Sequence, residues 1–171
     1  MSDNPAPTLT SARLTLRPLA SGDRDQLAAI QRLPDVAKWW GPVHDDDFIP
    51  DDPEVVQLTI VIDDQIAGLI QYSEEDDPMY RNAGIDLFLD PAKHGQGYGR
   101  EAIRLVAQHL IEVLGHHRLT IDPSAANAAA IRAYGAVGFK PVGILRQYER
   151  DVDESGWHDG LLMDLLAAEL T

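Results

Sequence analysis

The chain contains no cysteine among its 171 residues. Disulfide bonds, thiolate nucleophiles and sulfur-ligated metal sites are therefore excluded. Aromatic residues make up only 6% of the chain, and no apolar run reaches the ~18–20 residues that a membrane-spanning helix needs. The first residues, MSDNPAPTLTSA, lack the basic stretch and apolar stretch of a secretory signal. We therefore expect a cytoplasmic protein without a membrane partner.

Positive charge is also scarce, since 14 Lys and Arg residues stand against 28 Asp and Glu residues. Such an acidic chain is not expected to bind nucleic acid, whose phosphates it would repel. Fourteen acidic residues and a single basic one, Arg81, lie between His44 and Asp90, whereas residues 91–140 hold six basic and three acidic residues. This pattern is consistent with a solubilising acidic surface, and it also suits a protein that joins a cationic ligand to an anionic one.

The length predicts one domain, residues 13–171, after a flexible tail at 1–12. Apolar alternation and turn signals predict strands at 13–19 (an exposed edge), within 54–73 as a hairpin about Asp63 and Asp64, and at 83–89, 118–121, 139–148 and 158–166. Helices are predicted from an N-cap at Ser21 to about Arg32, from Pro34 to KWWGP, after the glycines up to Gly115, and over AANAAAIRAYGAVGF. Residues 43–54 and 74–81 are expected to be acidic loops. The order β-α-α-β-β-β-α-β-α-β-β predicts an α/β (α+β) fold: a single mixed, mostly antiparallel sheet flanked by helices.

Three glycines, Gly95, Gly97 and Gly99, stand at alternate positions directly before the third predicted helix. Backbone N–H groups at a helix N-terminus have no intrahelical acceptor, and glycine lets an anion approach them closely. The segment is therefore either a cradle for phosphate or a merely flexible strand-to-helix loop. It lacks the Gly-Lys-Ser/Thr ending of a nucleotide-triphosphate loop, and its spacing is not the Gly-x-Gly-x-x-Gly of dinucleotide-binding folds.

The segment HGQGYGREAI resembles the acetyl-coenzyme A pyrophosphate loop of the GNAT superfamily of N-acetyltransferases, Arg/Gln-x-x-Gly-x-Gly/Ala. Gly97 and Gly99 match this pattern, whereas His94 replaces the Arg or Gln. The element order is also similar from residue 13 to the C-terminus. Within the superfamily, the stretches VAKWWGP, GIDLFL and DPSAANAAAIRAYGAVGF and the general acidity resemble aminoglycoside 6′-N-acetyltransferases.

The resemblance implies the GNAT acyl-CoA N-acyltransferase fold and transfer of an acetyl group from acetyl-coenzyme A to a small cationic amine. The 6′-amine of an aminoglycoside antibiotic is the favoured acceptor, and a monomer or homodimer is expected. The segment GWHDGLLMDLL resembles the closing strand of ribosomal-protein and polyamine acetyltransferases, which leaves peptide N-termini and polyamines open as acceptors. Hydroxylysine-type acceptors and a non-catalytic acyl-CoA sensor also remain open.

By the same resemblance, Asp86 is the general base or the electrostatic anchor of the amine, and Tyr134 is the acid that protonates the thiolate. The alternatives are a solvent-facing carboxylate and a tyrosine packed at a helix–sheet seam. A backbone amide near a strand bulge at Asp86–Phe88 is expected to meet the oxyanion. The predicted cofactor-binding residues are Leu87, Phe88, Leu89, His94, Gly95, Gln96, Gly97, Tyr98, Gly99, Arg100, Asn127 and Tyr134.

The predicted acceptor-binding residues are Trp39, Trp40, Asp86 and Asp122. Indole faces attract ammonium groups, although one tryptophan of the pair is equally expected in the core. For Asp122, a turn or capping role is the alternative to binding. Most of the acidic runs between His44 and Asp77 are interpreted as solvated loop charge. The six histidines show no ligand spacing beside a carboxylate, and no metal is predicted.

Overall fold

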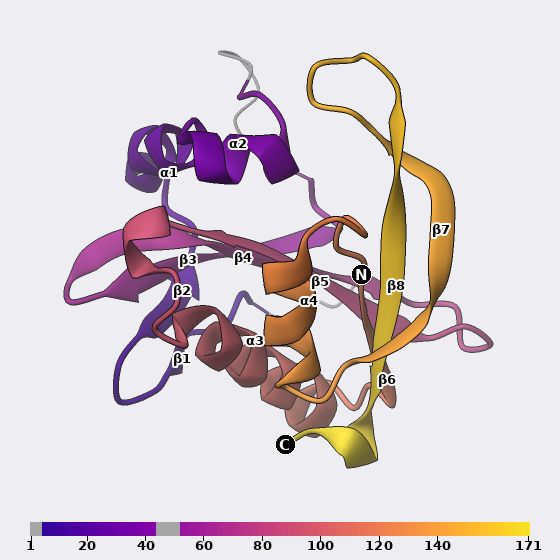
Figure 1. Cartoon of the computed structure of the whole chain (residues 1–171). Coiled ribbons are helices and arrows are strands. Elements are labelled where there is room, and N and C mark those ends of the chain that lie inside the picture. Colours follow the sequence, from indigo (N-terminus) through magenta and orange to yellow (C-terminus); the bar gives the residue numbers. More distant parts are fainter. Residues whose placement is uncertain (1–4, 44–51) are drawn as a thin grey trace.

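The computed structural model describes residues 5–43 and 52–171, and its strands form one eight-stranded sheet (Figure 1). The strands lie in the order β1-β2-β3-β4-β5-β6-β8-β7, and only β5 and β6 run parallel. Their bounds are β1 Leu9–Thr10, β2 Thr15–Pro18, β3 Val55–Ile62, β4 Gln65–Glu75, β5 Asn82–Leu89, β6 Arg118–Ile121, β7 Lys140–Arg150 and β8 Trp157–Leu166. The predicted single mixed, mostly antiparallel sheet is confirmed.

Strand β1 falls within the segment 1–12, which the sequence predicts as a tail. Leu9 and Thr10 pair with Leu16 and Thr15 of β2. The edge of the sheet is therefore β1, and the expectation that residues 13–19 form the edge is wrong. A two-residue strand with no alternation of its own gives too short a pattern to be recognised from sequence. Of the predicted acidic loop at 43–54, residues 44–51 lie outside the described part of the chain.

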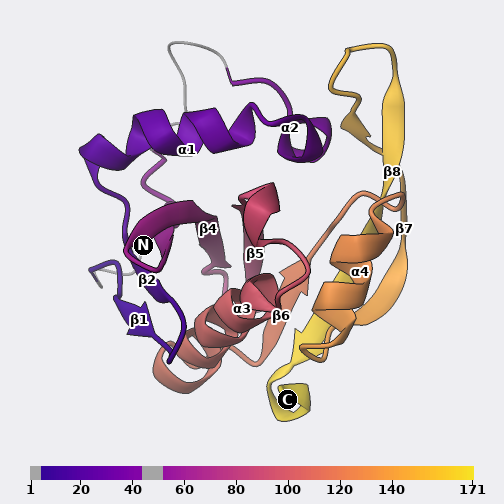
Figure 2. The same cartoon turned by 60° about the vertical axis from the view of Figure 1, so that its left-hand side comes forward.

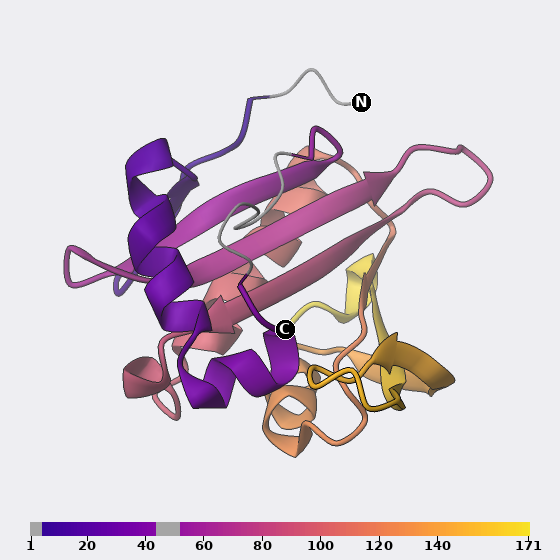
Figure 3. The same ribbon diagram turned by 90° about the horizontal axis from the view of Figure 1, so that it is seen from above.

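Helices cover both faces of the sheet (Figures 2 and 3). Helices α1 (Arg24–Gln31) and α2 (Pro34–Trp40) lie over one face, and α3 (Tyr98–Gln108) and α4 (Ala128–Gly135) lie on the other. The remaining helical turns are η1 (Ser21–Asp23), η2 (Pro91–Lys93), the π-type η3 (His109–Val113) and η4 (Ala167–Glu169). Across residues 5–43 and 52–171, no helix combines the length and apolarity that crossing a membrane requires.

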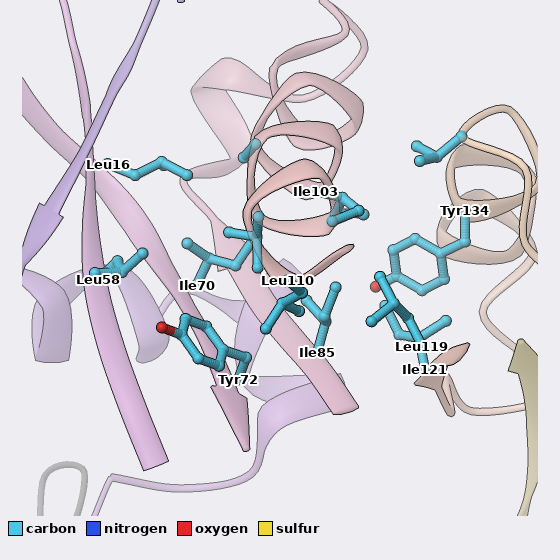
Figure 4. Packing of buried hydrophobic residues seen from close by; sticks show 14 of the residues in the cluster. Leu16, Leu58, Ile70, Tyr72, Ile85, Ile103, Leu110, Leu119, Ile121 and Tyr134 are labelled. Atoms are coloured by element: carbon cyan, nitrogen blue, oxygen red, sulfur yellow. The ribbon is translucent and has the colours of Figure 1, made fainter. Parts of the chain in front are cut away.

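The larger hydrophobic core lies between the sheet and α3. Leu16, Leu58 and Ile70 of β2–β4 meet Ile103 of α3 and Leu110 of η3, and all five side chains are fully buried (Figure 4). Along α3 the buried positions follow the helical spacing of the sequence, because one face of a 3.6-residue helix is apolar.

A smaller cluster on the opposite face joins Leu27 and Ile30 of α1 and Val36 of α2 to Leu69 and Phe88 of the sheet. The two clusters hold the sheet from both sides.

The start of the first helix is fixed by Asp23 rather than by the predicted N-cap Ser21. Its carboxylate accepts hydrogen bonds from the Ala20 backbone N–H (2.9 Å), from Thr59 Oγ1 (2.8 Å) and from two nitrogens of Arg17 (2.6 and 2.9 Å). The bonds from Arg17 contribute most to lowering the pKa of Asp23 to about 2, against the opposing effect of burial. Helix entry and sheet are thereby joined through one buried carboxylate.

Strands β5 and β6 separate after a short contact. They pair only through Ala83 with Leu119 and Gly84 with Thr120, after which β5 continues to Leu89 without a strand on that side. Because β6 ends at Ile121 and α4 follows soon after, the two halves of the sheet diverge at this point (Figure 1). The divergence opens the cleft described next.

Candidate active site

A cleft of about 1290 Å³ lies between β5 and α4 and continues toward α2 and β7. Every site residue predicted from the sequence borders it except Gln96. Gln96 turns away, since its amide donates a hydrogen bond to the Ala92 carbonyl (3.0 Å). The cleft therefore brings together residues from 39 to 134 that are distant in the chain.

One end of the cleft is formed by the glycine-rich turn that starts α3. Gly95 and Gly97 have φ values of +72° and +83°, which side chains rarely adopt. A Cβ atom added at Gly95 or Gly99 would have no heavy atom within 4 Å, so the main chain is open on that side. First-turn N–H groups of an 11-residue helix then provide donors at its positive end. The backbone here offers donors of the kind that a phosphate group accepts.

His94, which stands where the glycine-rich pattern has Arg or Gln, turns back toward β5. Its Nε2–H donates to the Leu89 carbonyl (2.8 Å), so the ring closes back on the end of β5. Lys93 and Arg100, beside the glycine-rich turn, and Arg132 of α4 also border the cleft. The basic region 91–140 of the sequence thus contributes three cationic side chains to its lining.

Asp86 lies in the part of β5 that pairs with β4 but has no strand on the β6 side, and it borders the cleft. Its carboxylate is enclosed by the cleft walls yet open to the cleft itself, so water reaches it until a ligand enters. Desolvation by these walls raises the pKa of Asp86 to about 7, the charges of Asp122 and Glu149 add to the rise, and the hydrogen bond from the Leu87 N–H opposes it. A carboxylate with a pKa near neutrality is suited to accept a proton.

The expected bulge at Asp86–Phe88 is wrong, because the β4–β5 register is continuous from Gly68–Leu89 to Glu75–Asn82. What distinguishes this stretch is the separation from β6, which leaves the Leu87 N–H to donate to Oδ1 of Asp86 (2.9 Å). A Cβ atom at Gly68 would lie 2.2 Å from the Phe88 carbonyl oxygen, so glycine is required where β4 and β5 approach most closely.

Tyr134 of α4 is buried at 8% exposure, and its ring lies beside Ile121 (Figure 4). Tyr134 is therefore packed in the core and also lines the cleft. Burial raises the pKa of Tyr134, and the charges of Asp86 and Asp122 add to the effect, so the phenol stays protonated. Within residues 5–43 and 52–171, its hydroxyl forms no hydrogen bond, which leaves it available as a donor to a ligand.

Asn127 precedes α4 as its N-cap, whereas the sequence predicts it within the helix over AANAAAIRAYGAVGF. Its Oδ1 accepts a hydrogen bond from the Ala130 N–H (3.2 Å). Its side chain still borders the cleft. The Nδ2 amide of Asn127 is therefore the part of its side chain left to donate to a ligand, since the oxygen accepts the bond from the helix.

Asp122, at the end of β6, accepts a hydrogen bond from the hydroxyl of Tyr148 on β7. Tyr148 and Glu149 both border the cleft, and the sequence analysis did not identify either. Gln147 has a φ of +49°, and the β7–β8 register shifts between Leu145 and Glu149. This irregularity adds Tyr148 and a third carboxylate to the acidic end of the cleft.

The two tryptophans occupy different environments. Trp40 donates from Nε1 to the Leu87 carbonyl (3.0 Å) and packs edge-on against Phe88, with ring centroids 4.9 Å apart. Trp39 also borders the cleft and carries the ammonium of Lys38 at 5.4 Å from its ring centroid. Trp40 therefore supports β5, and Trp39 is the one that shows cation binding by an indole. Among the described residues, no group of three or more His, Asp or Glu side chains is arranged to hold a metal ion.

A family model described as acetyltransferase (GNAT) domain matches residues 13–140. The chain is 30% identical over 105 residues to the probable N-acetyltransferase YjcK of Bacillus subtilis (strain 168), an alignment that spans 61% of this chain and 56% of that protein.

Solved structures share the fold. Ribosomal-protein-S5-alanine acetyltransferase from Vibrio fischeri superposes with a TM-score of 0.81 at 16% identity, over 96% of this chain and 99% of that one. Spermidine N-acetyltransferase from Vibrio cholerae, crystallised with CoA and spermine, superposes with a TM-score of 0.79 at 20% identity, over 93% of this chain and 98% of that one.

Proposed function

Because this chain belongs to the GNAT acetyltransferase family, we propose that it transfers the acetyl group of acetyl-coenzyme A to a primary amine of a small polycationic acceptor. The observation that carries the proposal is the charge separation in one cleft. Asp86, Asp122 and Glu149 face each other at one end, and the glycine-rich turn with Lys93 and Arg100 forms the other. The acidic end favours ammonium groups, and the basic end favours a diphosphate.

The donor side of the reaction is assigned to α3 and α4. Acetyl-coenzyme A supplies an acyl group activated as a thioester. The first-turn amides of α3 bind its diphosphate, and the Asn127 Nδ2 amide donates to the arm that extends along α4. As the amine nitrogen bonds to the thioester carbonyl carbon and the C–S bond breaks, the Tyr134 hydroxyl donates its proton to the departing sulfur, and the second proton of the amine restores the phenol. The raised pKa of Tyr134 keeps the phenol protonated before the reaction.

The acceptor side is assigned to Asp86 and its neighbours. The Asp86 carboxylate accepts the proton of the acceptor ammonium, which leaves a neutral amine as the nucleophile. Asp122, oriented by Tyr148, and Glu149 bind further ammonium groups of the same molecule. An acceptor with several ammonium groups therefore fits better than a peptide N-terminus, which offers one.

Among polycations we propose the 6′-amine of an aminoglycoside as the acceptor, because the segment around Asp122 and Tyr134 resembles the enzymes that modify this amine. A polyamine is the second candidate, and it is supported by the fold shared with a spermidine N-acetyltransferase crystallised with spermine.

The test is thiol release from acetyl-coenzyme A with a kanamycin-type aminoglycoside, spermidine, hydroxylysine and a peptide with a free N-terminus. We expect the highest kcat/KM for the aminoglycoside and a strong decrease on adding salt, since salt screens attraction between the acidic end and a polycation. Turnover of the peptide without turnover of either polycation would refute the proposal. Asp86→Asn is the matched variant, and it is expected to lose turnover while still binding coenzyme A.

A further inference from the structure

Arg13, in the connection between β1 and β2, contacts three parts of the glycine-rich turn. Its Nη1 donates to the Gln96 carbonyl (3.0 Å), its Nε donates to Oε2 of Glu101 (2.7 Å), and its guanidinium carbon lies 4.5 Å from the centroid of the Tyr98 ring. One side chain thus holds the turn before α3, its first residue and its first-turn carboxylate, although more than 80 residues separate them in sequence.

Gly97 has no side chain, and the guanidinium of Arg13 lies close to the space that a side chain there would enter. A Cβ atom at Gly97 would lie 3.4 Å from Nη2 of both Arg13 and Arg100. Two guanidinium groups therefore flank the left-handed residue that directly precedes α3. Because this turn carries the amides assigned to the diphosphate, its conformation decides where those amides point.

Glu101 makes the charge of Arg13 necessary. A carboxylate in the first turn of a helix interacts favourably with the helix dipole, but it also repels a diphosphate bound at the same end. Partial burial tends to raise the pKa of Glu101, yet hydrogen bonds from Ser11 and Arg13, the charge of Arg13 and, to a smaller extent, the charge of Arg104 bring it below its ordinary value. Glu101 is therefore ionised at neutral pH, and its charge is balanced by Arg13.

We propose that Arg13 is a positioning residue for the coenzyme A site, which fixes the glycine-rich turn and neutralises Glu101 so that the amides of α3 bind a diphosphate. The inference rests on the assignment of this turn to acetyl-coenzyme A, and it is independent of the acceptor. A solely structural tie between β1 and α3 would affect stability alone. Pairs as exposed as Arg13 (45%) and Glu101 (21%) contribute little to stability, so the effect is expected in binding.

Isothermal titration calorimetry with coenzyme A tests the inference without any acceptor. We expect Arg13→Met to raise the Kd of coenzyme A by about tenfold, the size expected for a charge-assisted network. Arg13→Lys, which keeps the charge without the forked donors, is expected to lie between Arg13→Met and the wild type.

The double variant Arg13→Met/Glu101→Gln is the decisive measurement. It is expected to recover much of the lost affinity, because the unbalanced carboxylate is gone, whereas loss of folding is not repaired by a second substitution. Arg150→Met is the matched control: Arg150 is an exposed arginine of β7 that pairs with Glu154 outside the cleft, and the Kd of coenzyme A for this variant is expected to stay within about twofold of wild type.

Wild-type affinity in folded Arg13→Met, or equal weakening in the single and double variants, would overturn the inference. Absence of coenzyme A binding by the wild-type protein would instead refute the assignment of the cosubstrate. If the proposed acceptor is wrong, the coenzyme A affinities of the wild type and of the Arg13 variants are not affected. A failure of the acceptor proposal can therefore be told apart from a failure of this inference.

Discussion

The hydroxyl of Tyr148 donates a hydrogen bond to Oδ2 of Asp122, which connects β7 to the end of β6 at the acidic end of the cleft. This bond is the main reason why the pKa of Tyr148 rises to about 12, so the phenol remains a donor at any physiological pH. The ring lies against Gly160 of β8, where a Cβ atom would be only 2.9 Å from Cδ1 of Tyr148. The orientation of Asp122 thus depends on the irregular part of β7.

Tyr148→Phe is expected to raise the KM for the acceptor about fivefold and leave the Kd of coenzyme A unchanged, since one hydrogen bond to an acceptor-binding carboxylate is lost. Steady-state kinetics with the acceptor varied and calorimetry with coenzyme A measure the two effects. Tyr80→Phe, at an exposed tyrosine far from the cleft, is the control. A fall in kcat at unchanged KM would argue against an acceptor-side role.

The pH profile of kcat/KM is expected to rise with an apparent pKa near 7, because Asp86 must be ionised to accept a proton. Asp122→Asn removes a like charge that raises the pKa of Asp86, so the rising limb is expected to move to lower pH. Asp64→Asn, in the exposed β3–β4 turn, is the control, and the rising part of its pH profile is expected to stay at the wild-type pH. If the rising part of the profile lies at the same pH in Asp122→Asn and in wild type, the charge of Asp122 does not act on the pKa of Asp86.

Asp86→Asn is also expected to change stability in a pH-dependent way. The folded state raises the pKa of Asp86 above its unfolded value near 3.8, so the folded protein holds a proton that the unfolded chain lacks between about pH 4 and 7. Stability contributed by this group is therefore lost as the pH rises through that window. The melting temperature of Asp86→Asn relative to wild type is expected to increase from pH 5 to pH 8. A difference that does not vary with pH would show that the folded-state pKa of Asp86 is ordinary.

Tyr134→Phe is expected to reduce kcat about a hundredfold, the lower range for loss of a general acid. The Kd of coenzyme A and the melting temperature should change little, because no residue of the described chain bonds to the hydroxyl. Tyr72→Phe provides the control, since Tyr72 is equally buried but lies outside the cleft. Full activity of Tyr134→Phe would leave the tyrosine with only its packing role.

Asp23→Asn is expected to reduce the free energy of unfolding by about 3 kcal/mol, the size for breaking a buried ion pair. With a folded-state pKa of about 2, the stabilisation by Asp23 is present above its unfolded pKa and is lost as the pH falls from about 4 to 2. Urea unfolding at pH 7 measures the loss of free energy of unfolding, and repeating it at pH 3 measures how that loss depends on pH. Asp25→Asn, on the exposed side of the same helix, is the control, and an equal loss there would argue against the Arg17–Asp23–Thr59 network.

Most of the fold was predictable because its signals are local. The Asp63–Asp64 turn, with φ values of +50° and +59°, and the apolar face of α3 each lie within a few residues of the pattern that predicts them. Asp86 and Tyr134 were identifiable because they stand beside recognisable motifs. Their meeting in one cleft, however, depends on the separation of β5 from β6 after Gly84, which no local pattern indicates.

The sequence did not indicate the residues whose contacts join segments that are distant along the chain. Tyr148 reaches the cleft because Gln147 adopts a positive φ, and glutamine is not a residue that signals this conformation. The one available hint was Gly160, whose lack of a side chain admits an aromatic ring from the neighbouring strand. Arg13 and Glu101 are 88 positions apart, and only the packing of β1 and β2 against α3 makes them neighbours.

The two-residue junction between β5 and β6 also has an evolutionary consequence. The groups proposed to bind the acyl donor lie on the turn before α3 and on α4, whereas the groups proposed to bind the acceptor outside β5 lie on α2, at the end of β6 and on β7. Under this proposal, substitutions on the β7–β8 arm change the amines that are recognised and leave the donor-binding residues unchanged. Such a layout allows a lineage to acquire new substrates through changes in a single hairpin.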